Sequence, residues 1–208
     1  MSMQDHKPEK PLHTAHGEAQ QQALVLAAFD LIAEGGFERL RTRDVAQRAG
    51  VNIATLHYYF ATKEDLIRGV VTHLVAEFSL PSPLLTPMAS DGPREQLQQD
   101  FADVRYQVQT TPATYLVLFE LFLRSFRDPA IRAIMQEMDL GWRHHIESYV
   151  RMGMQQGVFR TDLEPATMAA ALVALIKGCV MEILITSENF PVEEIFTAVE
   201  RWLAEHAT

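Results

Sequence analysis

Residues 42–66, TRDVAQRAGVNIATLHYYFATKEDL, decide the fold because they predict two short helices around a tight turn, followed by a third helix. Gly50 follows the last apolar residue of the first short helix, and a glycine there can adopt the left-handed conformation that ends a helix. Asn52 is a suitable N-cap for the second short helix. Thr62 and Asp65 form a variant of the capping box and predict the start of the third helix.

Several side chains around this turn are suited to contact nucleic acid. Two short helices joined in this way can place the second in the DNA major groove, which is about 12 Å wide, while the first crosses the backbone. We expect the Thr42 hydroxyl to cap the first short helix. His57, Tyr58 and Tyr59 are consecutive and cannot all face the core of a helix, so at least one points outward and can donate to a phosphate. Lys63 opposes the dipole of the third helix, which is favourable if a DNA phosphate binds at the same N-terminus.

The same residues resemble the TetR family of bacterial transcriptional regulators. The matching stretches are FDLIAEGGF at residues 29–37, TRDVAQRAGV at 42–51, TLHYYF at 55–60 and TKEDL at 62–66. The resemblance is specific over residues 20–71 and weaker beyond, although residues 153–178 also resemble the family's turn into its penultimate helix. Family members often carry Ser where this chain has Asn52 and Tyr where it has His57. Asn caps as well as Ser, and His can donate to phosphate, so both roles are retained.

We therefore interpret the second short helix as the DNA-reading element. Base edges are expected to be approached by Asn52, Ile53, Ala54 and Thr55, and phosphates to be held by Thr42, Arg43, His57, Tyr58, Tyr59 and Lys63. A generic helix pair inside an all-helical core is the alternative. The agreement in order and spacing between the turn glycine, the two caps, the aromatic cluster and the lysine argues against it.

The net charge of −9 does not exclude DNA binding, because the acidity lies in the second part of the chain. Residues 1–75 hold eight Lys and Arg against nine Asp and Glu, a net of −1, and residues 76–208 hold ten against eighteen, a net of −8. A local positive cluster surrounds the motif and is formed by Arg39, Arg41, Arg43, Arg48 and Lys63.

The composition predicts a cytoplasmic protein without a membrane partner. The N-terminus lacks the apolar stretch of a secretory signal, and the longest apolar run is too short to span a bilayer before Lys177 interrupts it. The single cysteine, Cys179, excludes an internal disulfide framework and fits a reducing compartment. We expect it to be a buried structural thiol.

The chain as a whole predicts an all-α fold of about nine helices. We expect a flexible leader at residues 1–16, a helix-turn-helix DNA-binding domain with its three-helix unit at 17–79, and a helical effector-binding and dimerisation domain at 80–208. Four prolines in residues 80–93 mark the boundary loop. Helices are expected at residues 17–34, 63–78, 94–110, 113–127, 129–156, 165–187 and 191–206, in addition to the two short ones.

The second domain is rich in apolar residues that can surround a ligand. The helix at residues 113–127 is apolar almost all round, which predicts burial. Methionine and aromatic side chains adapt to apolar ligands, although core packing is the simpler account of any one of them. The resemblance implies a small-molecule pocket, for which the candidates are Tyr115, Phe119, Phe122, Met135, Met138, Trp142, His145 and Tyr149. His145 could equally be a satisfied core histidine, and Glu120 is expected to pair with Arg124.

The last two helices predict a homodimer. Alanine side chains are small, so another helix can approach the helix at residues 165–187 closely. The helix at residues 191–206 carries an apolar stripe. A two-fold operator needs two reading heads about 34 Å apart, which a two-fold dimer supplies. The resemblance implies a four-helix interface, and its candidates are Ala170, Ala174, Ile195, Val199 and Trp202.

These features together predict a homodimeric regulator, with repression the expected mode, that binds a palindromic double-stranded DNA operator and is released by a small apolar or amphipathic effector. We expect no cofactor and no metal, since the adjacent His144 and His145 point about 100° apart on a helix. The alternatives are a ligand-binding coactivator of the same fold without DNA binding, and an enzyme. The sequence shows no catalytic triad arrangement, phosphate-binding glycine loop or metal-ligand spacing that would favour the enzyme.

Overall fold

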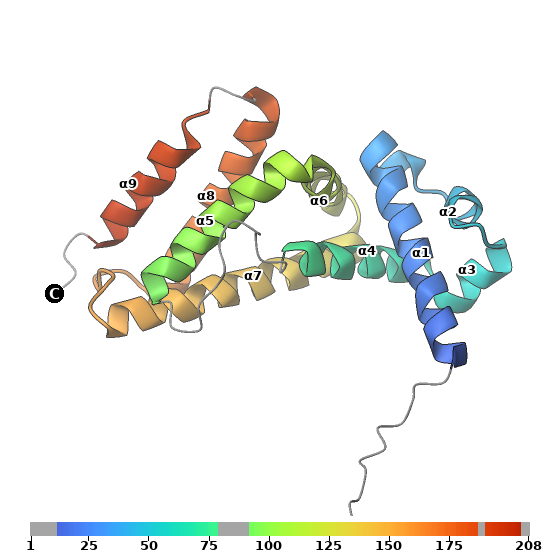
Figure 1. Ribbon diagram of the computed structural model, residues 1–208, viewed down its shortest axis with the longest axis horizontal. Helices are drawn as coiled ribbons and strands as arrows, with labels where there is room; N and C mark the ends of the chain where they lie inside the picture. The colour runs from blue at the N-terminus through green and yellow to red at the C-terminus, as the bar shows by residue number, and fades with distance from the viewer. Residues whose placement is uncertain (1–11, 79–91, 187–189, 205–208) are drawn as a thin grey trace, which may run out of the picture. The chain divides into compact units, whose positions relative to one another are not determined.

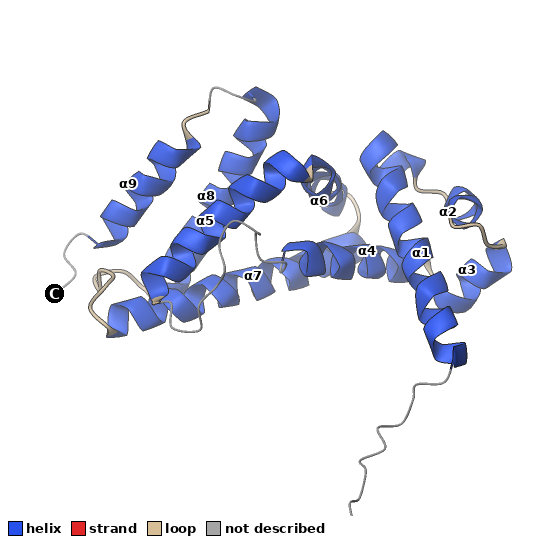
Figure 2. Ribbon diagram, viewed as in Figure 1, coloured by secondary structure: helices blue, strands red, loops and turns tan. Residues whose placement is uncertain are grey.

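The computed structural model describes residues 12–78, 92–186 and 190–204, and within these ranges the chain forms helices and loops without a strand (Figure 2). The all-α prediction is confirmed. The described elements are α1 (Leu12–Gly35), the 3-10 helix η1 (Phe37–Arg39), α2 (Thr42–Arg48), α3 (Ile53–Tyr59), α4 (Lys63–Phe78), α5 (Pro93–Thr110), α6 (Pro112–Ser125), α7 (Pro129–Gln155), α8 (Pro165–Thr186) and α9 (Val192–Ala204). They divide into two compact units after His73.

The first unit is built on α1, against which α2 and α3 pack (Figure 1). Leu24, Ala28 and Ile32 lie on one face of α1 and are fully or almost fully buried. Gly36 follows the helix with a φ of 72°, a conformation that favours glycine. The predicted start at Gly17 was wrong, because α1 already begins at Leu12. No proline lies between these two positions to stop the helix from extending toward the N-terminus.

Local capping signals set the bounds of α3 and α4. Asn52 accepts from the backbone N–H of Thr55 at 2.8 Å, which confirms its role as N-cap. The backbone N–H of Asp65 donates to the Thr62 hydroxyl at 3.0 Å, and the backbone N–H of Thr62 donates to the Asp65 carboxylate at 3.1 Å, which confirms the capping box. The cap predicted at Thr42 was wrong. Thr42 is the first residue of α2 and is itself helical, so its side chain does not stand at the cap position.

The second unit contains α5 to α9, and α7 contacts α5, α6 and α8 along its length (Figure 1). The helix α9 packs on α5 through Phe101 and Phe196, whose rings stack with centroids 4.0 Å apart. Asp128 caps α7 by accepting from two backbone N–H groups of the first turn. The boundary loop expected at residues 80–93 and the flexible leader expected at residues 1–16 lie largely outside the described residues, as do the C-terminal four residues. Residues 12–16 of the expected leader belong to α1.

The helix α6 is buried on one face only, so the prediction of burial all round was wrong. Leu116, Leu123 and Phe126 are 46%, 56% and 74% exposed. The opposite face, with Val117 and Leu121 at its centre, is fully buried. Composition alone cannot distinguish these two faces, because both are apolar. At the end of the helix, Arg124 pairs with Asp128 at 3.5 Å.

By length and composition, α8 is the one helix of the described ranges that could cross a membrane, whereas the sequence predicts an apolar run too short to do so. Core helices of soluble proteins share this character. Seven side chains of α8 are buried in the second unit, and Lys177 near its middle forms an ion pair with Asp139 of α7. These contacts are those of a helix packed within a folded domain.

Candidate nucleic-acid interface and effector domain

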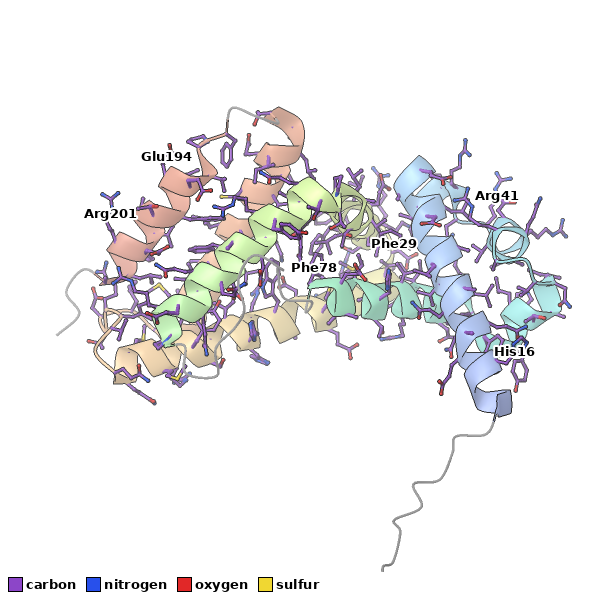
Figure 3. The ribbon with its side chains drawn as sticks, in the orientation of Figure 1. His16, Phe29, Arg41, Phe78, Glu194 and Arg201 are labelled. Carbon is purple, nitrogen blue, oxygen red and sulfur yellow. The ribbon has the colours of Figure 1, made fainter. Side chains whose placement is uncertain are left out.

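The helices α2 and α3 present a continuous set of exposed side chains. Tyr58 is 82% exposed and Ile53 is 38% exposed. Arg43, Ala54 and His57 are exposed as well. Asn52 is exposed too, so the structure places six of the ten predicted DNA-binding residues where an outside partner can reach them. Figure 3 shows the nearby Arg41 side chain extending outward from the same unit.

The inner side of the two short helices fixes this surface in place. Val45 of α2 and Leu56 of α3 are 0% and 1% exposed, and Phe60 directly after α3 is 4% exposed. Gly50 between the helices has a φ of 69°, and a Cβ at this position would meet nothing within 4 Å. The backbone conformation at position 50 therefore requires glycine, whereas close packing does not.

Asn52 and Thr55 are linked by two hydrogen bonds. The Asn52 oxygen Oδ1 accepts from the backbone N–H of Thr55 at 2.8 Å and from its hydroxyl at 3.1 Å. This use of Oδ1 leaves the Asn52 amide group to donate to a base edge and the lone pairs of the Thr55 hydroxyl to accept. Sequence reasoning found both residues but not the bond between their side chains.

The two tyrosines of α3 have different surroundings. Tyr59 is half-buried, and its hydroxyl donates to the side-chain oxygen of Gln20 in α1 at 3.1 Å. The rings of Tyr58 and Tyr59 meet edge to face with centroids 5.0 Å apart. Tyr59 therefore anchors α3 to α1, while Tyr58 keeps its hydroxyl at the surface.

Lys63 is half-buried, and its ammonium lies over the ring of Phe37 at 4.3 Å from the centroid. This contact holds the charge at the N-terminus of α4, where the sequence predicts a phosphate contact. Thr42 is also half-buried, at the start of α2. Both residues are therefore less accessible than the exposed residues of α2 and α3.

Arg48, one of the predicted positive cluster, is paired within the protein. Its two terminal nitrogens donate to the two carboxylate oxygens of Glu34 at 2.7 and 2.8 Å. The hydrogen bond lowers the pKa of Glu34 and raises that of Arg48. The cluster available to a partner is therefore smaller than the sequence suggests, and the exposed arginines that remain in it are Arg39, Arg41 and Arg43.

The predicted ligand-binding residues of the second unit differ in burial. Tyr115, Met135 and Tyr149 are buried, with at most 3% of their surface exposed. Those that are half-buried are Phe119, Phe122, Met138 and Trp142, while His145 is exposed. Two of the half-buried side chains, Phe122 of α6 and Trp142 of α7, have their ring centroids 4.7 and 5.8 Å from the Lys177 ammonium. Sequence reasoning did not select Lys177.

His145 belongs to a polar cluster between α5 and α7. Its Nε2 lies 3.8 Å from the carboxylate of Asp100, to which the buried Tyr149 hydroxyl donates at 2.5 Å. The carboxylate favours the protonated imidazole and raises the pKa of His145, while burial acts in the opposite direction. Burial, followed by the nearby Asp100 charge, raises the pKa of Tyr149. His145 is thus partnered within the chain, and Asp100 is a member of the cluster that sequence reasoning missed.

Cys179 is buried at 5% exposure, and burial raises the pKa of its thiol. This environment suits a structural thiol. Among the described residues, no group of three or more His, Cys, Asp or Glu side chains is arranged to hold a metal ion.

The predicted dimer residues are only partly accessible. Ala174 is exposed and Trp202 is 38% exposed, while Ala170, Ile195 and Val199 are half-buried. Ala171, one of the alanines that favoured this interface from the sequence, is exposed as well. Three further exposed residues of α8 continue with the spacing of a helix-packing stripe and were not selected from the sequence: Gly178, Met181 and Ile185. On α9 the labelled side chains of Glu194 and Arg201 extend outward (Figure 3).

Both units match families of bacterial transcriptional regulators. Residues 24–70 match the bacterial regulatory proteins of the tetR family, and residues 93–208 match the C-terminal domain of the BetI-type transcriptional repressors. A transcriptional regulator BetI from Agrobacterium fabrum is 29% identical over 117 residues, which cover 56% of each chain. The match thus spans about half the length of that curated relative.

Two solved structures share the fold over nearly their whole length. A putative TetR-family regulator from Rhodococcus sp. has a TM-score of 0.78 at 21% identity and covers 89% of this chain and 99% of its own. A putative transcriptional regulator from Saccharomonospora viridis, solved in complex with choline, has a TM-score of 0.70 at 25% identity and covers 91% and 97%. The matched families and relatives are transcriptional regulators, not enzymes. The chain belongs to the tetR family of bacterial transcriptional regulators and has a C-terminal domain of the BetI repressor type.

Proposed function

We propose that this regulator is a homodimer that reads a palindromic DNA operator with α3. The observation that carries the proposal is the exposed face of α2 and α3, with Tyr58 82% exposed beside Arg43 and His57. In this arrangement Asn52, Ile53, Ala54 and Thr55 approach base edges, and Arg43, His57 and Tyr58 hold phosphates. Thr42, Tyr59 and Lys63 complete the phosphate contacts after small side-chain movements.

The dimer is proposed to form through α8 and α9. Ala171, Ala174, Gly178, Met181 and Ile185 follow one another at intervals of three and four residues, so they lie on one face of α8, and all five are exposed. A helix of a second copy can approach such a stripe of small and apolar side chains closely. Trp202 would extend this surface onto α9, with Ile195 and Val199 partly covered by their own subunit.

The second unit is proposed to bind a small effector that weakens DNA binding, so that the regulator acts as a repressor in the cytoplasm. The BetI-type match over residues 93–208 supports repression, and the choline complex of the Saccharomonospora viridis relative supports a small-molecule effector. An effector has this action only if it binds the DNA-competent state more weakly than the other state. The aromatic and methionine residues of α6 and α7 are the proposed contacts.

The DNA contact is tested by the salt dependence of binding to a selected duplex. Arg43→Ala removes an exposed cation of α2 from each subunit of the dimer, so it should weaken binding and reduce the slope of log affinity against log salt by about two, one for each subunit. Arg94→Ala removes an exposed arginine from the first turn of α5 and is the matched control, which should leave the slope unchanged. Equal effects of both substitutions would indicate a general charge effect and count against the proposed interface.

A further inference from the structure

Both acceptor positions of the Asn52 side-chain oxygen are occupied within the protein. The atom that the backbone N–H of Thr55 approaches at 2.8 Å is the oxygen Oδ1, because an N–H donates and the amide nitrogen does not accept. The Thr55 hydroxyl lies 3.1 Å from the same oxygen and donates to it as well. A carbonyl oxygen has two lone pairs, so Oδ1 has no acceptor position left for an outside partner.

The amide nitrogen of Asn52 takes no part in these two bonds. Its NH2 group carries two protons, and the residue is exposed on the surface that α2 and α3 present. Toward an outside partner, Asn52 is therefore a donor only. The next residues, Ile53 and Ala54, are exposed and have no polar side-chain atom. These three consecutive residues thus offer one side-chain donor and no available side-chain acceptor.

A donor without an acceptor distinguishes bases by their exocyclic groups. Asparagine commonly reads adenine in the major groove through two hydrogen bonds, one donated to N7 and one accepted from the N6 amino group. Asn52 cannot form the second bond while its oxygen caps α3. Guanine and thymine present the keto oxygens O6 and O4, which accept, whereas adenine and cytosine present amino groups, which donate. A donor-only amide therefore favours a keto base.

We propose that Asn52 is a specificity-determining residue that selects a keto base, guanine or thymine, at one position of each operator half-site, and that it does not read adenine. The inference rests on the proposed function, in which α3 reads a palindromic operator. Its physical origin is the cap of α3, because the two bonds within the protein use the acceptor on which adenine recognition depends.

Releasing the Asn52 oxygen to read adenine would be unfavourable. The backbone N–H of Thr55 would lose its capping partner at the start of a helix of only seven residues. The Thr55 hydroxyl would lose its acceptor at the same time. One bond to a base would replace two bonds within the protein, so we expect the cap to persist in the DNA complex.

The test is selection of bound duplexes from random DNA with the full-length wild type and the variant Asn52→Asp. Aspartate keeps a capping oxygen and replaces the donating NH2 group by an accepting oxygen. At the position that Asn52 reads, the wild type should favour guanine or thymine over adenine or cytosine by about fivefold. Asn52→Asp should instead favour cytosine or adenine there, with the other positions of the half-site unchanged.

Gln47→Glu is the matched control, because it makes the same change from amide to carboxylate at an exposed position of α2. It adds the same negative charge to each subunit, so it should weaken binding to all duplexes and leave the base preference at every position as in the wild type. This comparison separates general repulsion of DNA from a change in base reading. Circular dichroism establishes that each variant folds.

Asn52→Ser decides the question if the aspartate variant enriches no sequence. Serine keeps a capping oxygen, has no charge and lacks the amide donor, so it should lose the keto preference at the one position. Base preferences that stay the same in every Asn52 variant that enriches a sequence would overturn the proposal. Adenine or cytosine enriched by the wild type at the position where the variants differ would also overturn it.

Failure of this inference is distinguishable from failure of the proposed function in the same selections. A wild type that enriches a palindromic sequence, in which no position responds to substitution of Asn52, retains the proposed regulator and loses only the assigned base reading. A wild type that enriches no sequence overturns both.

Discussion

Asn52 stabilises the start of α3 through one side-chain oxygen, which accepts from the backbone N–H of Thr55 at 2.8 Å. Asn52→Ala leaves that N–H without its cap, so it should lower the free energy of unfolding by about 1 kcal/mol. Chemical denaturation followed by circular dichroism measures the difference. Asn52→Ser retains a capping oxygen and serves as the control. An alanine variant as stable as the serine variant would show that the cap contributes nothing.

His145 should make stability depend on pH, because Asp100 raises its pKa in the folded protein. A raised pKa means that the protonated ring stabilises the fold fully below the unfolded pKa of about 6.5, and that this contribution disappears as the pH rises through the folded pKa. The stability lost in His145→Gln should therefore be larger near about pH 5.5 than near about pH 8. Because the side chain is 63% exposed, we expect at most about 1 kcal/mol.

Thermal unfolding at the two pH values measures this difference. His144→Gln removes the neighbouring exposed imidazole and is the matched control. A loss in His145→Gln that grows with rising pH would have the wrong sign and would contradict the assigned ion pair.

At the scale of elements, α7 contains two glycines with opposite surroundings. A Cβ on Gly153 would overlap the ring of Phe159, which is 1% exposed, whereas a Cβ on Gly141 would meet nothing within 4 Å. Gly153→Ala should lower the free energy of unfolding by about 1–3 kcal/mol through overpacking. Gly141→Ala should raise it by up to about 1 kcal/mol, since alanine favours a helix interior. Denaturant titrations measure the free energy of unfolding of both variants. Equal effects would contradict the close packing at Gly153.

The elements that the sequence predicts well are those set by local signals. Three such signals are the Asn52 cap, the Thr62 capping box and Gly50, and each begins or ends a helix through residues close to it in the sequence. The helices in the structure begin and end where these signals predict. The bounds of α4 agree with the prediction at both ends. Helix caps and turns can be predicted from the sequence because they do not depend on the rest of the fold.

What the sequence did not predict depends on contacts between distant residues. The burial of only one face of α6 is set by which helices surround it, and the pattern of an almost uniformly apolar helix cannot reveal this. Arg48 was assigned to a positive surface because its partner Glu34 is fourteen residues away in another helix. Lys177 and Asp139 are 38 residues apart, and their pairing required the packing of α7 against α8. The exposed stripe of α8 was identified only in part for the same reason.

Reading a palindromic operator requires two copies of the chain. Ala174→Glu places a charge in the middle of the exposed stripe of α8, and burying it against a second copy would cost several kcal/mol. The wild type should sediment with twice the chain mass of 23.5 kDa, and the variant with the chain mass itself. Ala133→Glu makes the same change at an exposed position of α7 and should remain dimeric. A wild type of single-chain mass, or an Ala174→Glu variant that remains dimeric, would exclude this interface.

Selection of bound duplexes from random DNA tests whether a dimer of this chain reads a palindromic operator through α3. The wild type is compared at a stated low salt concentration with an Arg43→Ala, Tyr58→Phe double variant, whose changes lie at exposed positions and should leave the fold intact. We expect the wild type to enrich a palindromic sequence and the double variant to enrich it weakly or not at all. A wild type that enriches no sequence at low salt would contradict the claim.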